Sequence, residues 1–173
     1  MKILALDSSG LVASVAVVEN DTLLAEYTVN YKKTHSQTLL PMLDEISNMT
    51  ELDLSTIDAI AVAGGPGSFT GLRIGSATAK GLGLALEKPL ISIPTTAAIA
   101  YNIWDTNKFV CPIMDARRNQ VYTGVYCYTD HRLDTVWEQD TMSIEALAEG
   151  LNCLDHEVIF LGDGVAVYRE KLQ

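Results

Sequence analysis

The stretch IDAIAVAGGPGSFTGLRIG, residues 57–75, decides the fold of this chain. Residues 57–63 are β-branched or small apart from Asp58, which predicts a short buried strand. The run Gly64-Gly65-Pro66-Gly67 breaks that strand. Ser68 or Thr70 can then cap a helix that continues to about Glu87. A buried strand joined by a tight turn to a helix indicates an α/β protein.

Three strands and a helix are predicted before this stretch, and a strand and a helix after it. The strands cover residues 2–6, 11–18 and 22–31 and form an antiparallel meander. The first helix runs from His35 to Met49, with Ser36 as its cap and Pro41 in its first turn. After residue 87, a strand over 89–93 leads to a helix over 95–104. By fold-level analogy, the order β-β-β-α-β-α-β-α is that of a ribonuclease-H-like domain.

The second half of the chain starts in the same way. Strands are predicted over 109–114, 120–128 and 133–138, a helix over 143–151, and a fourth strand over 157–161. Asp7 and Asp115 each end the first strand of one half, so the pattern indicates an internal duplication. We therefore predict two α/β domains of the ribonuclease-H-like, actin-like ATPase class. The first spans residues 1–95, and the second, residues 96–173, is incomplete.

Composition limits the class of function. The chain has 12 Lys and Arg against 22 Asp and Glu, a formal net charge of −10, which disfavours direct binding to nucleic acid. The three cysteines are widely spaced and form no CxxC pair, which fits a reduced cytoplasmic setting. The N-terminal apolar run ends at Asp7, too early for a signal peptide, and we expect no membrane span.

Four segments together resemble one family. They are ILALDSS, THSQTLLPML, IDAIAVAGGPGSFTGLRIG and DARRNQVYTGVY, which cover most of residues 3–126, and GPGSFTGLR is the most specific of them. The chain is thereby similar to the TsaB (YeaZ) family of glycoprotease-like proteins in the actin, Hsp70 and sugar-kinase superfamily. Members of that family are longer than this chain.

The resemblance implies a function and partners. TsaB proteins are non-catalytic subunits that support TsaD, a catalytic paralogue, and the ATPase TsaE joins them. TsaD forms N6-threonylcarbamoyladenosine at position 37 of tRNAs that read ANN codons. The resemblance further implies a homodimer when the chain is alone, and contact with tRNA only through the complex.

Two loops could bind an anion or a nucleotide. Asp7-Ser8-Ser9-Gly10 is similar to the first phosphate loop of the superfamily, where a strand-end carboxylate holds hydrated Mg²⁺. Gly65, Gly67 and Ser68 lie at a helix start, where backbone N–H groups suit anions. The alternatives are a structural strand-end carboxylate and a tight glycine turn. An ATPase or phosphotransferase thus remains the alternative function. The second-half loop Asp115–Arg118 lacks glycine, so we expect no cofactor in this chain, although ATP or Mg²⁺ could bind at the complex.

Histidine spacing argues against a metal site. The resemblance implies that TsaD holds a metal with two helical histidines four residues apart, whereas Leu39 lies four residues after His35 here. We predict no metal site and no catalytic residue, which makes a metallopeptidase the least favoured reading.

Small residues at intervals of four in the helix after Ser68 predict close packing, either on the chain's own sheet or across an interface. On the interface reading, Gly75→Leu or Ala79→Glu would weaken association without unfolding the chain. Arg117 and Arg118 are predicted as a further partner contact, with a solvated turn as the alternative. The residues predicted for the partner or dimer interface are Leu39, Met42, Leu43, Gly71, Arg73, Gly75, Thr78, Ala79 and Leu82.

Overall fold

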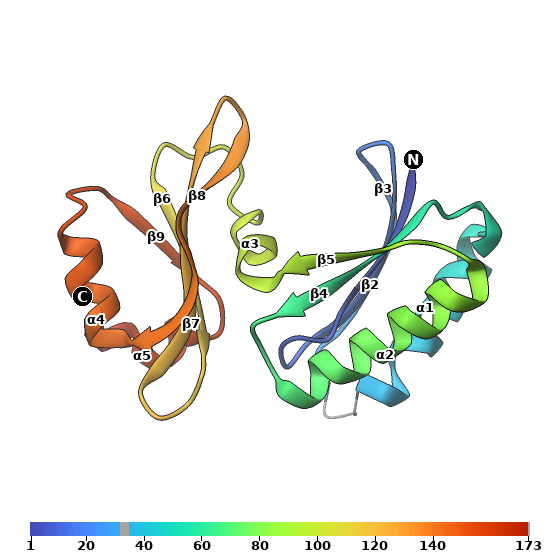
Figure 1. Ribbon diagram of the computed structural model, residues 1–173, viewed down its shortest axis with the longest axis horizontal. Helices are drawn as coiled ribbons and strands as arrows, with labels where there is room; N and C mark the ends of the chain where they lie inside the picture. Colours follow the sequence, from blue (N-terminus) through green and yellow to red (C-terminus); the bar gives the residue numbers. More distant parts are fainter. Residues whose placement is uncertain (32–34, 173) are drawn as a thin grey trace. The chain divides into compact units, whose positions relative to one another are not determined.

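The computed structural model describes residues 1–31 and 35–172, which form two compact units divided between Ile93 and Pro94. Each unit has its own β-sheet (Figure 1). The predicted α/β class is therefore confirmed. Within the described residues, no helix is both long and apolar enough to cross a membrane.

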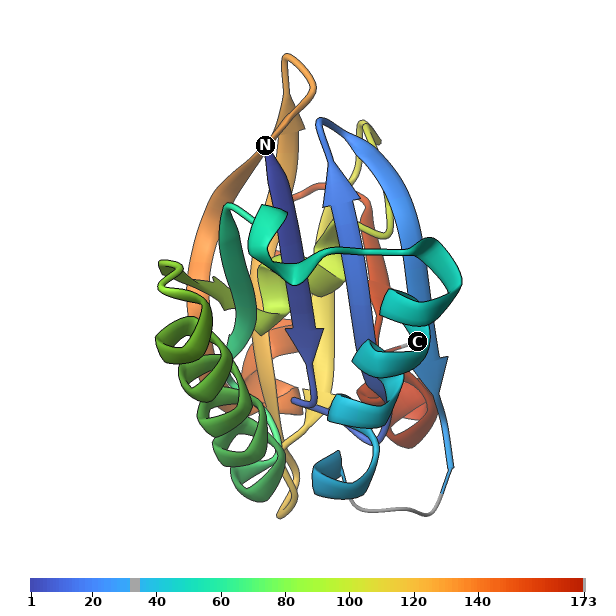
Figure 2. The same cartoon turned by 90° about the vertical axis from the view of Figure 1, so that its right-hand side faces the viewer.

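Unit 1 is a five-stranded sheet with two helices on one face. Its strands lie in the order β3-β2-β1-β4-β5. β1 pairs antiparallel with β2 and parallel with β4, as the predicted meander and α/β order require. Figure 2 shows α1 and α2 together in front of this sheet. The elements are β1 (Lys2–Asp7), β2 (Ala13–Glu19), β3 (Thr22–Val29), α1 (Leu39–Thr50), β4 (Ala59–Gly65), α2 (Phe69–Leu86) and β5 (Leu90–Pro94).

The core of unit 1 lies between this sheet and the two helices. Leu4, Leu6, Val15 and Val17 alternate along β1 and β2 toward the helices and are at most 3% exposed. The α1 side chains that meet them recur at helical spacing, as an amphipathic helix requires. These are Leu39, Met42, Leu43 and Ile46.

Unit 2 repeats the arrangement with four strands, in the order β8-β7-β6-β9. β6 pairs antiparallel with β7 and parallel with β9, as β1 does with β2 and β4. The elements are α3 (Thr95–Ala100), β6 (Phe109–Asp115), β7 (Gln120–Thr129), β8 (Arg132–Ser143), α4 (Ile144–Asn152), β9 (Val158–Leu161) and α5 (Gly164–Tyr168).

Several predicted boundaries are corrected. α1 begins at Leu39, not His35, because residues 35–37 form a separate 3-10 turn and Thr38 occupies the cap position without a side-chain cap bond. The helix predicted over 95–104 ends at Ala100, and β8 extends beyond its predicted end at residue 138 to Ser143. The short helix α5 was not predicted. Ser68 and Ser143 do cap α2 and α4, since each side chain accepts a backbone N–H three residues later.

Candidate partner face and strand-end loops

The loop after β1 is locked against the start of α2. The Asp7 Oδ1 atom accepts the Ser9 N–H at 2.7 Å, and the Ser8 hydroxyl donates to the Gly71 carbonyl at 2.9 Å. In the other direction, the Ser68 N–H donates to the Ser9 carbonyl at 2.6 Å. Ser8 and Ser9 are only 2% and 3% exposed. The two predicted anion loops therefore lie together, and these polar groups bond to each other.

Glycine is needed where the two loops meet. A Cβ atom on Gly67 would lie 2.4 Å from the Ser9 carbonyl oxygen, and one on Gly71 would lie 2.0 Å from that of Ser8. Gly65, with φ of +103°, adopts a backbone conformation that side chains disfavour. The tight-turn reading accounts for all three glycines by backbone geometry alone.

The corresponding loop of unit 2, after β6, is held by a different set of hydrogen bonds. The Asp115 Oδ1 atom accepts the Arg117 N–H at 2.9 Å, and the Tyr168 hydroxyl donates to the same oxygen at 3.1 Å. Burial, followed by this hydrogen bond to the carboxylate, raises the pKa of Tyr168. The Asp163 carboxylate accepts the N–H of Asp115 at 3.1 Å. Tyr168 and Asp163 were not predicted, because each lies about fifty residues from Asp115 with no local signal.

Arg117 and Arg118 lie on the exposed turn between β6 and β7, where both have positive φ values. The Arg117 guanidinium lies 3.3 Å from the Asp115 carboxylate, but the Arg117 side chain is 84% exposed, so the pair contributes little to stability. The two arginines are thus accessible, as a partner contact would require.

His35 contacts backbone and is not part of a metal-binding cluster. Its Nε2 atom lies 2.9 Å from the Gly10 carbonyl oxygen. Among residues 1–31 and 35–172, no group of three or more His, Cys, Asp or Glu side chains is arranged to hold a metal ion.

The small-residue ladder of α2 faces its own sheet. Gly71, Gly75, Ala79 and Gly83 are the buried residues of the helix. A Cβ on Gly75 would lie 2.5 Å from the Ser8 hydroxyl, and Ala79 is 0% exposed within the core of unit 1. Packing inside the domain therefore explains the ladder. The expectation that Gly75→Leu and Ala79→Glu would spare the fold is corrected, because both substitutions fall in closely packed space.

The other predicted interface residues differ in how far their side chains are buried. Leu39, Met42 and Leu43 are at most 4% exposed and belong to the core, so they are not available to a partner. Thr78 and Leu82 are partly buried, and Arg73 is exposed. The exposed apolar side chains of α1 and α2 are a different set. They are Leu40 (52% exposed), Met49 (78%), Phe69 (69%) and Leu84 (85%).

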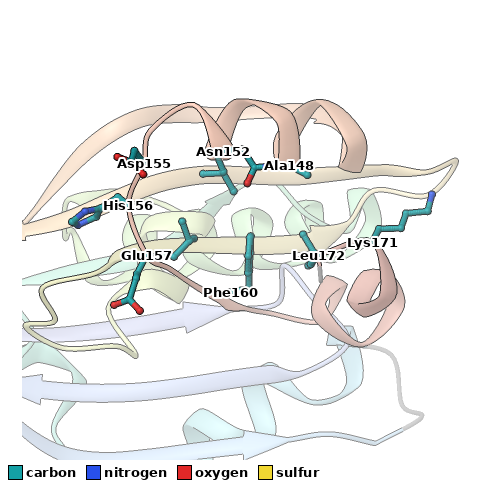
Figure 3. A pocket seen from close by; sticks show the side chains of 10 residues that line it. Ala148, Asn152, Asp155, His156, Glu157, Phe160, Lys171 and Leu172 are labelled. Carbon is teal, nitrogen blue, oxygen red and sulfur yellow. The ribbon is translucent and has the colours of Figure 1, made fainter.

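A hollow of about 530 Å³ lies in unit 2 beside α4 and β9 (Figure 3). Phe160 and Leu172 line its apolar part, and Asp155, Glu157 and Lys171 are among its charged residues. α2, which follows β4 in unit 1, has 18 residues, whereas α5, which follows β9 in unit 2, has 5.

Comparisons with known proteins decide the family. Residues 22–173 match the family described as TsaD, tRNA N6-adenosine threonylcarbamoyltransferase. The Bacillus subtilis tRNA threonylcarbamoyladenosine biosynthesis protein TsaB is 34% identical over the whole chain, which spans 76% of that protein. The Escherichia coli TsaB protein is 33% identical over 95% of the chain and 72% of its own length. This chain belongs to the TsaB family.

Solved structures agree with this assignment. A Pseudomonas aeruginosa protein with similarity to the peptidase YeaZ superposes with a TM-score of 0.87 at 29% identity, over 99% of this chain and 79% of its own. YeaZ from the same organism gives 0.75 at 31% identity, over 83% and 68%. An exopolyphosphatase from Cytophaga hutchinsonii, at 10% identity and a TM-score of 0.52 over 100% of this chain and 73% of its own, shares the fold alone. The TsaB family assignment and the actin-like fold are thus both confirmed.

Proposed function

We propose that this chain is a non-catalytic subunit of the machinery that forms N6-threonylcarbamoyladenosine at position 37 of tRNAs that read ANN codons. In this role it binds the catalytic paralogue TsaD and acts together with the ATPase TsaE. Its membership of the TsaB family supports the pathway, since its named relatives are tRNA threonylcarbamoyladenosine biosynthesis proteins.

The strand-end loops support a non-catalytic role. A phosphate loop presents unpaired N–H groups and a free carboxylate to its ligand. Here the Ser9 N–H bonds to Asp7 and the Ser68 N–H bonds to the Ser9 carbonyl. Binding a phosphate at these N–H groups would first require breaking the local Ser9–Asp7 bond and the Ser68–Ser9 bond that joins the loop after β1 to the start of α2.

The outward side of α1 and α2 is the observation that carries the partner proposal. Leu84 is 85% exposed and Met49 is 78% exposed, although both lie on helices that also have a well-buried inner face. Single exposed apolar residues are ordinary, but several on two adjacent helices favour an interface. The same surface would form the homodimer when the chain is alone. TsaD would compete for it.

Charge introduced on this surface tests the proposal. We expect Leu84→Glu, and independently Met49→Glu, to weaken binding to the TsaD protein of the same organism at least roughly tenfold, because a carboxylate would be buried in an apolar contact. The fold should survive, since both side chains are exposed. Calorimetry and light scattering measure association, and circular dichroism checks the fold.

Val167→Glu is the matched control, because Val167 is an apolar residue on the short helix α5 of unit 2 with 58% exposure. It should bind as the parent chain does. If Leu84→Glu and Met49→Glu both bind TsaD with parental affinity, α1 and α2 do not form the partner face.

A further inference from the structure

We propose that the groove between α2 and β5 binds an extended segment of a partner protein that is rich in apolar and acidic residues. The segment would add a strand to the free edge of β5 and place carboxylates beside Arg73 and Lys80. One of the outward apolar residues, Phe69 of α2, lines this groove, and the contact goes beyond the proposed function. It is tested on the isolated chain.

The groove has a volume of about 610 Å³ and lies within unit 1. α2 forms one wall, and residues of β4 and β5 form the floor. Gly64 permits the close spacing of the floor, since a Cβ there would lie 2.1 Å from the Ser92 hydroxyl oxygen. Leu90 is 41% exposed on the same strand, so the floor offers apolar surface to an incoming side chain.

The charge of the groove is opposite to that of the chain. Arg73 and Lys80 are exposed and are the only charged residues among those that line the groove, whereas the chain carries a net charge of −10. The Arg73 guanidinium lies 4.0 Å from the centre of the Phe69 ring, which fixes the cation along the helix wall. Two cations with no lining carboxylate favour an acidic ligand.

The free edge of β5 favours an extended protein segment as the ligand of the groove. β5 is the last strand of the unit 1 sheet, so one side of its backbone is unpaired among the described residues. Its sequence, LISIP, contains no charged side chain. Charges on an edge strand hinder pairing, as Asp134, Glu138 and Asp140 do on β8, and β5 has none before Pro94 ends it, which leaves Leu90–Ile93 for pairing. An uncharged edge beside an apolar groove suits strand addition, for which nucleic acid has no matching backbone.

Peptide titration of the ¹⁵N-labelled full chain tests this inference. The probes are the acetylated, amidated hexapeptide EVDVEV, its lysine counterpart KVKVKV, and a hexauridylate RNA. We expect the acidic peptide alone to shift the amide signals of residues 90–93 and of α2 near Arg73 and Lys80. The double variant Arg73→Glu/Lys80→Glu should weaken that binding at least roughly tenfold, while Arg132→Glu, an exposed charge reversal in unit 2, should leave it unchanged.

Three outcomes would overturn the inference. The first is failure of the acidic peptide to bind, or signal changes that lie outside the groove. The second is equal binding of the lysine peptide, or retention of affinity by the folded double variant, because charge would then play no part. The third is the same set of shifts with hexauridylate, which would indicate a phosphate-binding surface instead.

Discussion

Gly71 and Gly81 lie ten residues apart in α2 and have opposite surroundings. A Cβ on Gly71 would lie 2.0 Å from the Ser8 carbonyl oxygen, whereas a Cβ on Gly81 would meet nothing within 4 Å. Gly71 therefore shows the need of glycine for close packing, and Gly81 shows only the loss of helix stability that glycine causes. The spacing of small residues in the sequence already sets Gly71 apart from Gly81, and the fold shows what Gly71 packs against.

We expect opposite stability changes from alanine at these two positions. Gly81→Ala should raise the free energy of unfolding by about 0.8–1.0 kcal/mol, the ordinary gain for an exposed helical position. Gly71→Ala should lower it by roughly 1–3 kcal/mol, because the methyl group overlaps the loop after β1. Urea unfolding followed by circular dichroism measures both. Equal gains in the two variants would contradict the interlocked loops.

Predictions for single residues are confirmed where the sequence signal is local. Ser68 and Ser143 cap their helices because a cap bonds only to the next turn. The predictions failed for Leu39, Gly75 and Ala79 because a spacing of four indicates that a helix face is buried, but not what covers it. Tyr168 was missed for a related reason, since its hydroxyl reaches an oxygen 53 residues away.

Among the elements of unit 2, the turn after α5 is joined to α4 by a network of exposed hydrogen bonds. The Lys171 ammonium donates to the Glu145 carboxylate at 2.7 Å, and the Asn119 amide donates to the same group at 2.8 Å. The Lys171 hydrogen bond, followed by that of Asn119, lowers the pKa of Glu145 from 4.5 to about 2. Three segments of unit 2 therefore meet at one carboxylate.

This network predicts a direction of pH dependence. Because the pKa of Glu145 is lower in the folded chain, its contribution is complete above pH 4.5 and is lost as the pH falls toward about 2. We expect the Glu145 carboxyl signal in NMR to titrate well below 4.5, and Glu145→Gln to shift the amide signals of residues 169–172 at neutral pH. High salt should reduce both effects. Titration of Glu145 near 4.5 would contradict the network.

The positions of helices were predicted from the sequence more accurately than their ends. The apolar spacing in residues 39–46 correctly predicted α1, but His35 lies in a 3-10 turn before it and contacts the Gly10 carbonyl, 25 residues earlier. α5 was missed because five residues are too few for helical periodicity to be recognised.

At the scale of the whole molecule, the order of strands and helices was sufficient to predict the fold class. The repeat of β1, β2 and β4 as β6, β7 and β9 has the same pairing directions in both units. Pattern order carries this information because parallel pairing requires a crossover, whereas adjacent antiparallel strands need only a turn. The proposed partner face could not be predicted in the same way, since its exposed apolar residues do not differ in type from buried ones.

The charge of the whole chain predicts weak binding to tRNA. With a net charge of −10, the isolated chain should bind tRNA no more tightly than roughly 10⁻⁴ M at physiological salt. Arg117→Glu/Arg118→Glu should not change this result, because the two arginines would be a contact only within the complex. Filter binding over a range of salt concentrations measures the affinity. Micromolar binding that weakens with salt and is lost in the double variant would contradict an indirect role.

The most direct test of the proposed function is reconstituted threonylcarbamoylation of tRNA. Purified TsaD, TsaE and the synthase that forms threonylcarbamoyl-adenylate would be incubated with tRNA, with and without this chain, and position 37 would be analysed by mass spectrometry. We predict that the modified adenosine forms only when the chain is present, and that Val167→Glu supports it whereas Leu84→Glu does not. Equal modification with and without the chain would contradict its role as a required subunit.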